Sequence, residues 1–271
     1  MPQTTNKITP SVMLWTLQGT FEEKLALAAA AGIPSVGLVT EHREWSSPDS
    51  RHYLDLAQSQ GLAFDTIVGN YDWLHRPVTM LNPAHREGFL NDVEEALLWA
   101  KNLNVPQVIV LAGNVQPELS REAQHASMVE AGRRAAELAE TAEVTLILEP
   151  LNPKIDHEGY FLPDCEEGLA VVKAVDSPCF RLLFDVYHEY VQTGSALPAI
   201  KDCVAHTTMF HVADAPSRHD PGTGEMPWDE IYRAIGELGY SGYIALEYLP
   251  VGDQLSSLRK AVQQMLIHLP A

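Results

Sequence analysis

Basic residues are scarce in this 271-residue chain. It carries 18 Lys and Arg against 36 Asp and Glu, which gives a formal net charge of −18, and no run of Lys or Arg occurs. A protein that binds duplex nucleic acid or an anionic membrane normally offers a basic surface to the phosphates. The composition therefore argues against nucleic acid and anionic membranes as partners, and by itself it mainly indicates solubility.

Cysteines and long apolar runs are also few. Cys165, Cys179 and Cys203 show neither metal-binding nor redox spacing, and an odd number of cysteines without a signal peptide is typical of free thiols. No stretch approaches the roughly 20 apolar residues of a membrane helix. The first residues, MPQTTNKITPSVML, lack the charged-then-apolar pattern of a signal peptide. We therefore expect a cytoplasmic protein.

Linker-like and low-complexity segments are absent as well, and short aliphatic runs alternate with amphipathic stretches instead. Helix starts are marked by a capping-box pattern at Thr20 and Glu23 and by Asn82 followed by Pro83. β-branched and aromatic residues favour strands over buried helices in the aliphatic runs. Eight such runs occur, at residues 11–15, 35–39, 62–68, 107–113, 145–150, 180–185, 207–214 and 242–248.

Eight strands that alternate with about eight helices predict an α/β protein, a single (β/α)₈ TIM barrel that forms one domain over residues 1–271. A doubly wound open sheet is the alternative. That fold would need a glycine-rich phosphate loop after an early strand, and the sequence has no such loop.

Polar residues follow the last four aliphatic runs. Glu149 ends LILE, Asp185 ends RLLFD, His211 lies in MFHVAD, and Glu247 ends YIALE. In a barrel these strand ends meet at one mouth, where three carboxylates would repel one another. A bound divalent cation resolves that conflict and keeps the carboxylates ionised.

The ligand set of three carboxylates and one imidazole suits Mn²⁺ or Mg²⁺, with Co²⁺ or Zn²⁺ as alternatives. For any single residue the alternative is a helix cap, a surface ion pair or, for His211, an ordinary core histidine. Asp214, in the loop that follows, is either a competing ligand or a group that supports one.

Four ordered motifs, LILEPLNP with GYFL shortly after, LLFDVYH, HVADAPSRHDPGTGE and GYIALEY, closely resemble hydroxypyruvate isomerases. These enzymes belong with the xylose-isomerase-like barrels of sugar isomerases and epimerases. The specific match covers about residues 145–250. The resemblance implies one divalent metal on Glu149, Asp185, His211 and Glu247, with the two glutamates in proton transfer. It also implies a homo-oligomer, either a dimer or a tetramer.

One departure from that family concerns His211, where hydroxypyruvate isomerases have glutamine. Histidine there, together with PGTGEMPWDEI, looks more like the ketose 3-epimerases. Those epimerases, however, have a glutamate six residues after the first metal glutamate, and this chain has Ile155 there. The segments EPLNPK and EGYFL favour the hydroxypyruvate isomerase side.

The expected reaction moves a proton between adjacent carbons of a small hydroxy-oxo acid or ketose through an enediolate. Glu149 and Glu247 are the expected acid–base groups, each able to bind metal through one oxygen and to handle a proton with the other. A bound cation would stabilise the charge that develops on the substrate oxygens. A ketose 3-epimerase and a non-catalytic sugar-binding barrel remain alternatives, and endonuclease IV, with the same barrel, is disfavoured by the acidic charge.

Other residues are candidates for substrate binding. The resemblance places the equivalent of His188 on substrate oxygens, and the alternative is a surface histidine. Arg218, in SRHDPGTGE, can hold a carboxylate or hydroxyl through a bidentate contact, the alternative being an exposed loop arginine. His219 is a weaker candidate. Trp15 and Tyr71, with Trp73, follow early strands and are expected to wall the pocket, although aromatic residues there can equally be core or subunit contacts.

Overall fold

The computed structural model of this protein describes residues 8–269. Its strands form a closed parallel barrel in which each strand pairs with the next in sequence and β1 closes the ring on β8. The strands are β1 (Ile8–Met13), β2 (Ser35–Gly37), β3 (Ala63–Val68), β4 (Gln107–Leu111), β5 (Thr145–Glu149), β6 (Phe180–Asp185), β7 (Thr207–Val212) and β8 (Gly242–Leu246). The predicted α/β barrel is therefore confirmed. The ends of the predicted domain, residues 1–7 and 270–271, lie outside the described residues.

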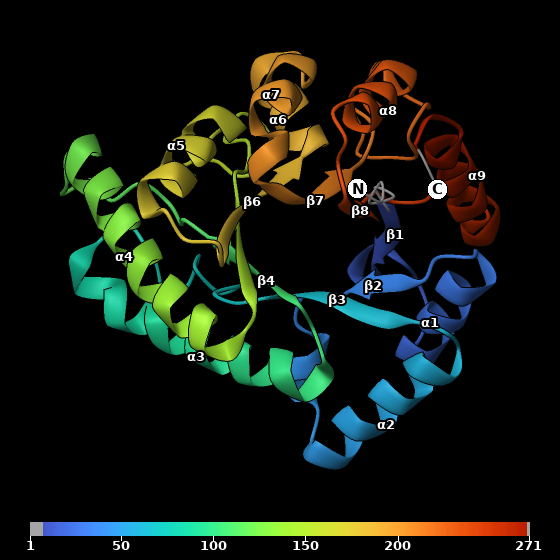
Figure 1. Cartoon of the computed structure of the whole chain (residues 1–271), viewed down its shortest axis with the longest axis horizontal. Coiled ribbons are helices and arrows are strands. Elements are labelled where there is room, and N and C mark those ends of the chain that lie inside the picture. Colours follow the sequence, from blue (N-terminus) through green and yellow to red (C-terminus); the bar gives the residue numbers. More distant parts are fainter. Residues whose placement is uncertain (1–7, 270–271) are drawn as a thin grey trace, which may run out of the picture.

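Helices surround the strands (Figure 1). The α-helices are α1 (Phe21–Ala30), α2 (Ser47–Ser59), α3 (Arg86–Leu103), α4 (Arg121–Ala142), α5 (Cys165–Val175), α6 (Val186–Thr193), α7 (Leu197–Cys203), α8 (Trp228–Glu237) and α9 (Gln254–His268). Short 3₁₀ turns are η1 (Leu14–Thr16), η2 (Glu41–Glu44), η3 (Pro83–His85) and η4 (Val204–His206). No helix among residues 8–269 is long and apolar enough to cross a membrane.

The helix starts follow the predicted caps. Thr20 and Glu23 form the reciprocal capping box of α1, which satisfies two otherwise free backbone N–H groups. Asn82 caps the short turn η3 rather than α3 itself, because Pro83 tightens the first turn before α3 begins at Arg86. The first predicted strand, 11–15, in fact starts at Ile8 and ends at Met13, and its last residues form η1.

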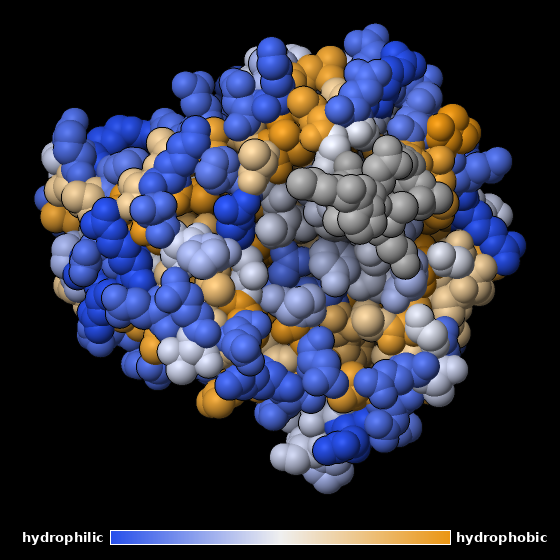
Figure 2. All heavy atoms as spheres, in the orientation of Figure 1, coloured by the Kyte–Doolittle hydropathy of each residue, from blue (hydrophilic) through white to orange (hydrophobic). Residues whose placement is uncertain are grey.

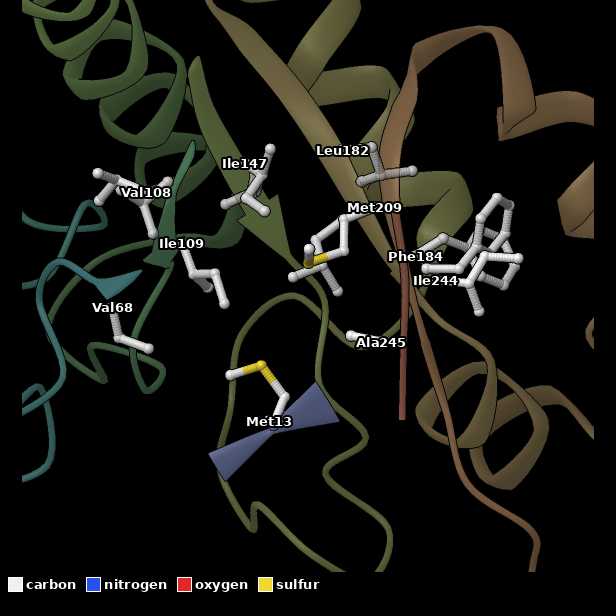
Figure 3. Close-up of a cluster of buried hydrophobic side chains, with 14 of the residues drawn as sticks. Met13, Val68, Val108, Ile109, Ile147, Leu182, Phe184, Met209, Ile244 and Ala245 are labelled. Atoms are coloured by element: carbon white, nitrogen blue, oxygen red, sulfur yellow. The ribbon is translucent and has the colours of Figure 1, made fainter. Parts of the chain in front are cut away.

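The core fills the barrel interior and the layer between strands and helices. Figure 3 shows side chains such as Met13, Ile109 and Met209, which come from three different strands and are at most 1% exposed. Hydrophilic side chains dominate the outer helices on the face shown in Figure 2, with apolar residues scattered between them. Since every strand is covered by helices, the strands read as almost continuous apolar runs, which is why they could be recognised.

Candidate active site

The four polar residues at the late strand ends converge at the C-terminal mouth of the barrel. Glu149 and Asp185 are the last residues of β5 and β6, His211 lies on β7, and Glu247 directly follows β8. Side chains alternate along a strand, so each polar residue stands above an apolar residue two positions earlier. Those apolar residues, Ile147, Leu183, Met209 and Ala245, are fully buried and form an apolar floor below the cluster.

One ligand atom from each of Glu149, Asp185, His211 and Glu247 lies within 4.8 Å of those of the other three, and all four residues are buried. His211 Nδ1 is close to both glutamates, 3.4 Å from Oε1 of Glu149 and 3.2 Å from Oε2 of Glu247. The sequence therefore identified four residues that the fold does bring together. We name them the mouth cluster.

The mouth cluster has more carboxylate groups than nearby cationic side chains. Burial raises the pKa of Asp185 to about 8, although Arg218 opposes the shift. Burial would also raise the pKa of Glu247, but His211 and Arg218 hold it well below its usual range. In spite of burial, the pKa of His211 lies well above its usual value because of Glu247 and Glu149. The protein's own cations therefore do not fully compensate the three carboxylates at neutral pH.

The donor set fits a divalent cation. Three carboxylates and one imidazole offer hard oxygen ligands with one nitrogen, which matches Mn²⁺ or Mg²⁺ and also admits Co²⁺ or Zn²⁺. A cation at this position would allow all three carboxylates to remain ionised in a buried site. The mouth cluster can therefore hold a metal ion.

Arg218 reaches the mouth cluster from the loop after β7. Its Nη2 lies 2.7 Å from Oε2 of Glu247 and 3.8 Å from Oδ2 of Asp185, and its side chain is only 19% exposed. The backbone of Arg218 has a positive φ of 54°, which is uncommon for a residue other than glycine. Arg218 is thus neither an exposed loop residue nor a free one.

Asp214 explains how the loop holds this shape. Its carboxylate accepts hydrogen bonds from the backbone N–H groups of Gly222, Gly224 and Met226. A side chain at Gly224 would collide with the carbonyl of Ala215, 2.0 Å from the Cβ position. Asp214 therefore organises the loop and is not one of the grouped metal-ligand candidates. His219, the other residue left open, donates from Nδ1 to the carbonyl of Leu249 at 2.9 Å and is half-buried.

A cavity of about 390 Å³ opens above the mouth cluster. Glu149, His211 and Glu247 line it, and so do the predicted wall residues Trp15, in η1 after β1, and Tyr71, in the loop after β3. Its further lining residues include Arg218, His188, Trp73, Glu41 and His157. Pockets of about 300–1,000 Å³ are typical of small-molecule sites, and this one has the convergent polar groups that such sites need.

Trp15 does more than wall the cavity. Its indole Nε1 donates a hydrogen bond of 2.9 Å to Oε1 of Glu247. Arg218 donates to the other oxygen of the same carboxylate. Both oxygens of Glu247 are therefore oriented by donors, a feature that the sequence did not reveal because residues 15 and 247 are far apart in the chain.

His188 lies in the first turn of α6, three residues after Asp185, and is 2% exposed. The side chain of Asp185 accepts from the backbone N–H of His188 and so caps α6. Asp185 thus combines the cap that we considered as an alternative with its place in the mouth cluster. Burial holds the pKa of His188 well below its usual value, with Arg218 acting in the same direction. His188 is therefore a buried neutral imidazole, not a surface histidine.

A larger cavity, of about 670 Å³, lies on the outside of the barrel between α5, α6 and α7. Asp164, Lys173, Glu189 and Asp202 are among its lining residues. None of the mouth-cluster residues reaches it, and the one group of potential metal ligands within residues 8–269 lies elsewhere. We therefore place the candidate active site in the smaller cavity, where the chemistry converges.

Known proteins share the barrel fold of this chain. A profile of the xylose isomerase-like TIM barrel family matches residues 25–266. The 2-oxo-tetronate isomerase of Cupriavidus necator is 28% identical over 230 residues, which cover 85% of this chain and 87% of that protein. The hydroxypyruvate isomerase of Escherichia coli is 28% identical over 177 residues, 65% of this chain and 68% of that protein.

Among solved structures, the D-psicose 3-epimerase of Clostridium cellulolyticum H10, crystallised with D-tagatose, superimposes with a TM-score of 0.83. The match covers 97% of this chain and 100% of that chain, at 17% sequence identity. At this level of identity the likeness shows a shared fold.

Proposed function

The chain belongs to the xylose isomerase-like TIM barrel family, and from this membership we propose that it is a metal-dependent isomerase. Its substrate is a small hydroxy-oxo acid, and the reaction moves a proton between two adjacent carbons, as in hydroxypyruvate isomerase. The observation that carries the proposal is the convergence of Glu149 and Glu247 on His211 Nδ1, at 3.4 and 3.2 Å, in residues that line one cavity.

In this proposal Glu149, Asp185, His211 and Glu247 hold one divalent cation, with Mn²⁺ or Mg²⁺ preferred. The cation supplies electrostatic stabilisation for the negative charge that develops on the substrate oxygens. The protein supplies the proton transfers. One glutamate removes the proton from a carbon, and the other returns a proton to the neighbouring carbon. In the same turnover the hydroxyl oxygen on the first carbon gives up its proton and the former carbonyl oxygen on the second carbon takes up a proton, so that the hydroxyl and carbonyl groups exchange places.

The residues around the two glutamates hold them for that task. Trp15 and Arg218 each donate to one oxygen of Glu247, which fixes the plane of its carboxylate. Arg218 also faces the cavity and offers its guanidinium to a substrate carboxylate, for which a fork of N–H donors is well suited. The apolar floor below the cluster keeps water from the reacting carbons.

A ketose 3-epimerase is the second candidate, favoured by His211, which stands where hydroxypyruvate isomerases have glutamine. Epimerisation would use the same two glutamates but return the proton to the carbon that lost it. Against this candidate, the position at which those epimerases have a glutamate is occupied by Ile155, which has no carboxylate and is 66% exposed. A non-catalytic sugar-binding barrel would bind ligand and exchange no proton.

A screen of small 2-oxo acids and ketoses with the Mn²⁺-loaded protein in deuterated water tests the proposal. Hydroxypyruvate or 2-oxo-tetronate should yield an isomer in which the carbonyl group has moved to the adjacent carbon. That isomer should carry deuterium on the newly protonated carbon, while ketohexoses should yield little 3-epimer. Faster formation of a 3-epimer than of any isomer would select the epimerase. Absence of carbon-bound exchange with every compound would contradict both enzymes and favour the binding protein.

We further propose that the chain acts as one domain, as a homo-oligomer, on a small molecule and not on nucleic acid. A gel-shift experiment at physiological salt checks the last point. Because the chain has a net charge of −18, no shift of duplex DNA is expected.

A further inference from the structure

We propose that Asn152 is a positioning residue that fixes His188 as a neutral ring with its proton on Nε2, so that His188 can only donate a hydrogen bond to substrate. The inference rests on the proposed function for the identity of the substrate, but the state of the ring follows from contacts within the protein. Asn152 lies in the loop after β5 and is fully buried beside His188.

The orientation of the Asn152 amide is determined by the loop itself. Its Oδ1 accepts hydrogen bonds from the backbone N–H groups of Ile155, at 3.0 Å, and Asp156, at 3.2 Å. Backbone N–H groups can only donate, so the atom that faces them must be the carbonyl oxygen. The amide nitrogen Nδ2 therefore points to the opposite side.

On that side Nδ2 meets His188. It lies 2.6 Å from Nδ1 of His188 and 2.7 Å from Oδ2 of Asp156. The backbone N–H of Asn152 also points at the same Nδ1, at 3.4 Å. Nδ1 is thus faced by two donors and must accept with its lone pair, since a proton on Nδ1 would oppose two N–H groups.

The ring proton therefore lies on Nε2. Within residues 8–269 this buried nitrogen has no hydrogen-bond partner, and Oδ2 of Asp185 is 3.7 Å away. A buried donor without an acceptor costs free energy, which a ligand oxygen in the cavity would recover. Because His188 lines the cavity, its Nε2–H is placed to meet such an oxygen.

This state of the ring has a chemical consequence. A neutral N–H donor strengthens its hydrogen bond as negative charge grows on the substrate oxygen, and it does not accept a bond from a hydroxyl group. His188 would therefore favour an oxygen that becomes anionic in the transition state over one that stays a hydroxyl. Asn152 acts through His188 and touches no reacting atom in this assignment.

The ¹⁵N chemical shifts of His188 in the Mg²⁺-loaded protein test the assignment. The wild type should show a protonated Nε2 and an unprotonated Nδ1. Asn152→Asp keeps the oxygen that accepts from the loop but replaces the donor by an acceptor, so the proton should move to Nδ1. With a turned-over substrate, kcat should fall by about 10²–10³-fold with little change in KM, as for loss of one oxyanion donor.

Asn82→Asp is the matched control. Asn82 also accepts a backbone N–H through Oδ1, from Ala84, but it does not line the cavity. This control should change neither the shifts of His188 nor kcat. A wild-type ring with a protonated Nδ1 would overturn the assignment even if no variant folded, and so would an unchanged tautomer in Asn152→Asp. The expected shifts in a protein that turns over no substrate would support Asn152 as the tautomer-fixing residue and refute the isomerase proposal alone.

Discussion

Replacing Arg218 by alanine should destabilise the metal-free protein much more than the metal-loaded protein. The guanidinium lies 2.7 Å from Glu247 and 3.8 Å from Asp185, whose side chains are 10% and 2% exposed. Removing one partner of a buried pair costs about 3–5 kcal/mol. Because Arg218 is itself 19% exposed, we expect a loss of roughly 2–3 kcal/mol without metal.

With Mn²⁺ bound, the cation compensates the same carboxylates, and the loss should shrink to about 1 kcal/mol. In a chain of this size about 1 kcal/mol corresponds to a change in Tm of about 2 °C. The Tm of wild type and Arg218→Ala is therefore measured in excess chelator and in excess Mn²⁺. The expected losses are roughly 5 °C and 2 °C.

A second ion pair provides the control for this experiment. Arg76 makes two hydrogen bonds to the buried carboxylate of Asp92, on α3 and away from the cavity. The loss of Tm in Arg76→Ala should be the same with chelator and with Mn²⁺. An equal loss for Arg218→Ala under both conditions would refute the argument that Arg218 and a cation compensate the same carboxylates.

Three further predictions follow from the same structure. Glu247→Gln keeps one ligand oxygen but removes a base, so turnover should fall by about 10²–10⁴-fold while metal analysis still finds a bound ion. Arg218→Ala should also lower kcat/KM by at least tenfold, about 1.4 kcal/mol, in steady-state assays with saturating Mn²⁺. Burial, with a smaller effect of Arg43, lowers the pKa of His42 from 6.5 to about 4. Between these two pH values the His42 imidazole is protonated in the unfolded chain but not in the folded chain. The free energy of unfolding should therefore fall by about 3 kcal/mol as the pH drops from 6.5 to 4. In urea unfolding curves over this range, His42→Phe should lose that part of the pH dependence.

The fold was predictable because the barrel repeats one simple pattern. Runs such as residues 107–113 and 145–150 are apolar on both faces, as expected for parallel strands covered by helices. The ends of elements were less accessible. The segment 14–16, LWT, has two apolar residues out of three and so looks like a continuation of the strand before it, but it forms a 3₁₀ turn.

The mouth cluster was predictable for the same reason, since a barrel brings consecutive strand ends together. The position of each residue at the end of an apolar run was enough to predict that Glu149, Asp185, His211 and Glu247 meet. Contacts between side chains of different loops and helices could not be predicted from the sequence. The bond from Asn152 to His188 spans 36 residues, and nothing in EPLNP indicates which way that amide points.

Arg218 is the clearest case in which the sequence alone was not enough to predict the surroundings of a side chain. A loop rich in glycine and proline suggests an exposed arginine whose loss costs little stability. The structure places Arg218 against Glu247 and Asp185 instead, because Asp214 binds three backbone N–H groups and folds the loop over the mouth. A position of Arg218 near the substrate is compatible with this structure. A small loss of stability on removal of its side chain, which the loop composition suggested, is no longer expected.

The metal content of the wild type and of Asp185→Ala, after equal loading with Mn²⁺ and removal of free ion, tests the central claim most directly. Asp185 is the most deeply buried carboxylate of the mouth cluster, at 2% exposure, and serves the proposed site from β6. We expect one ion per wild-type chain and a loss of binding in the variant. Equal stoichiometry and affinity in both proteins would contradict it.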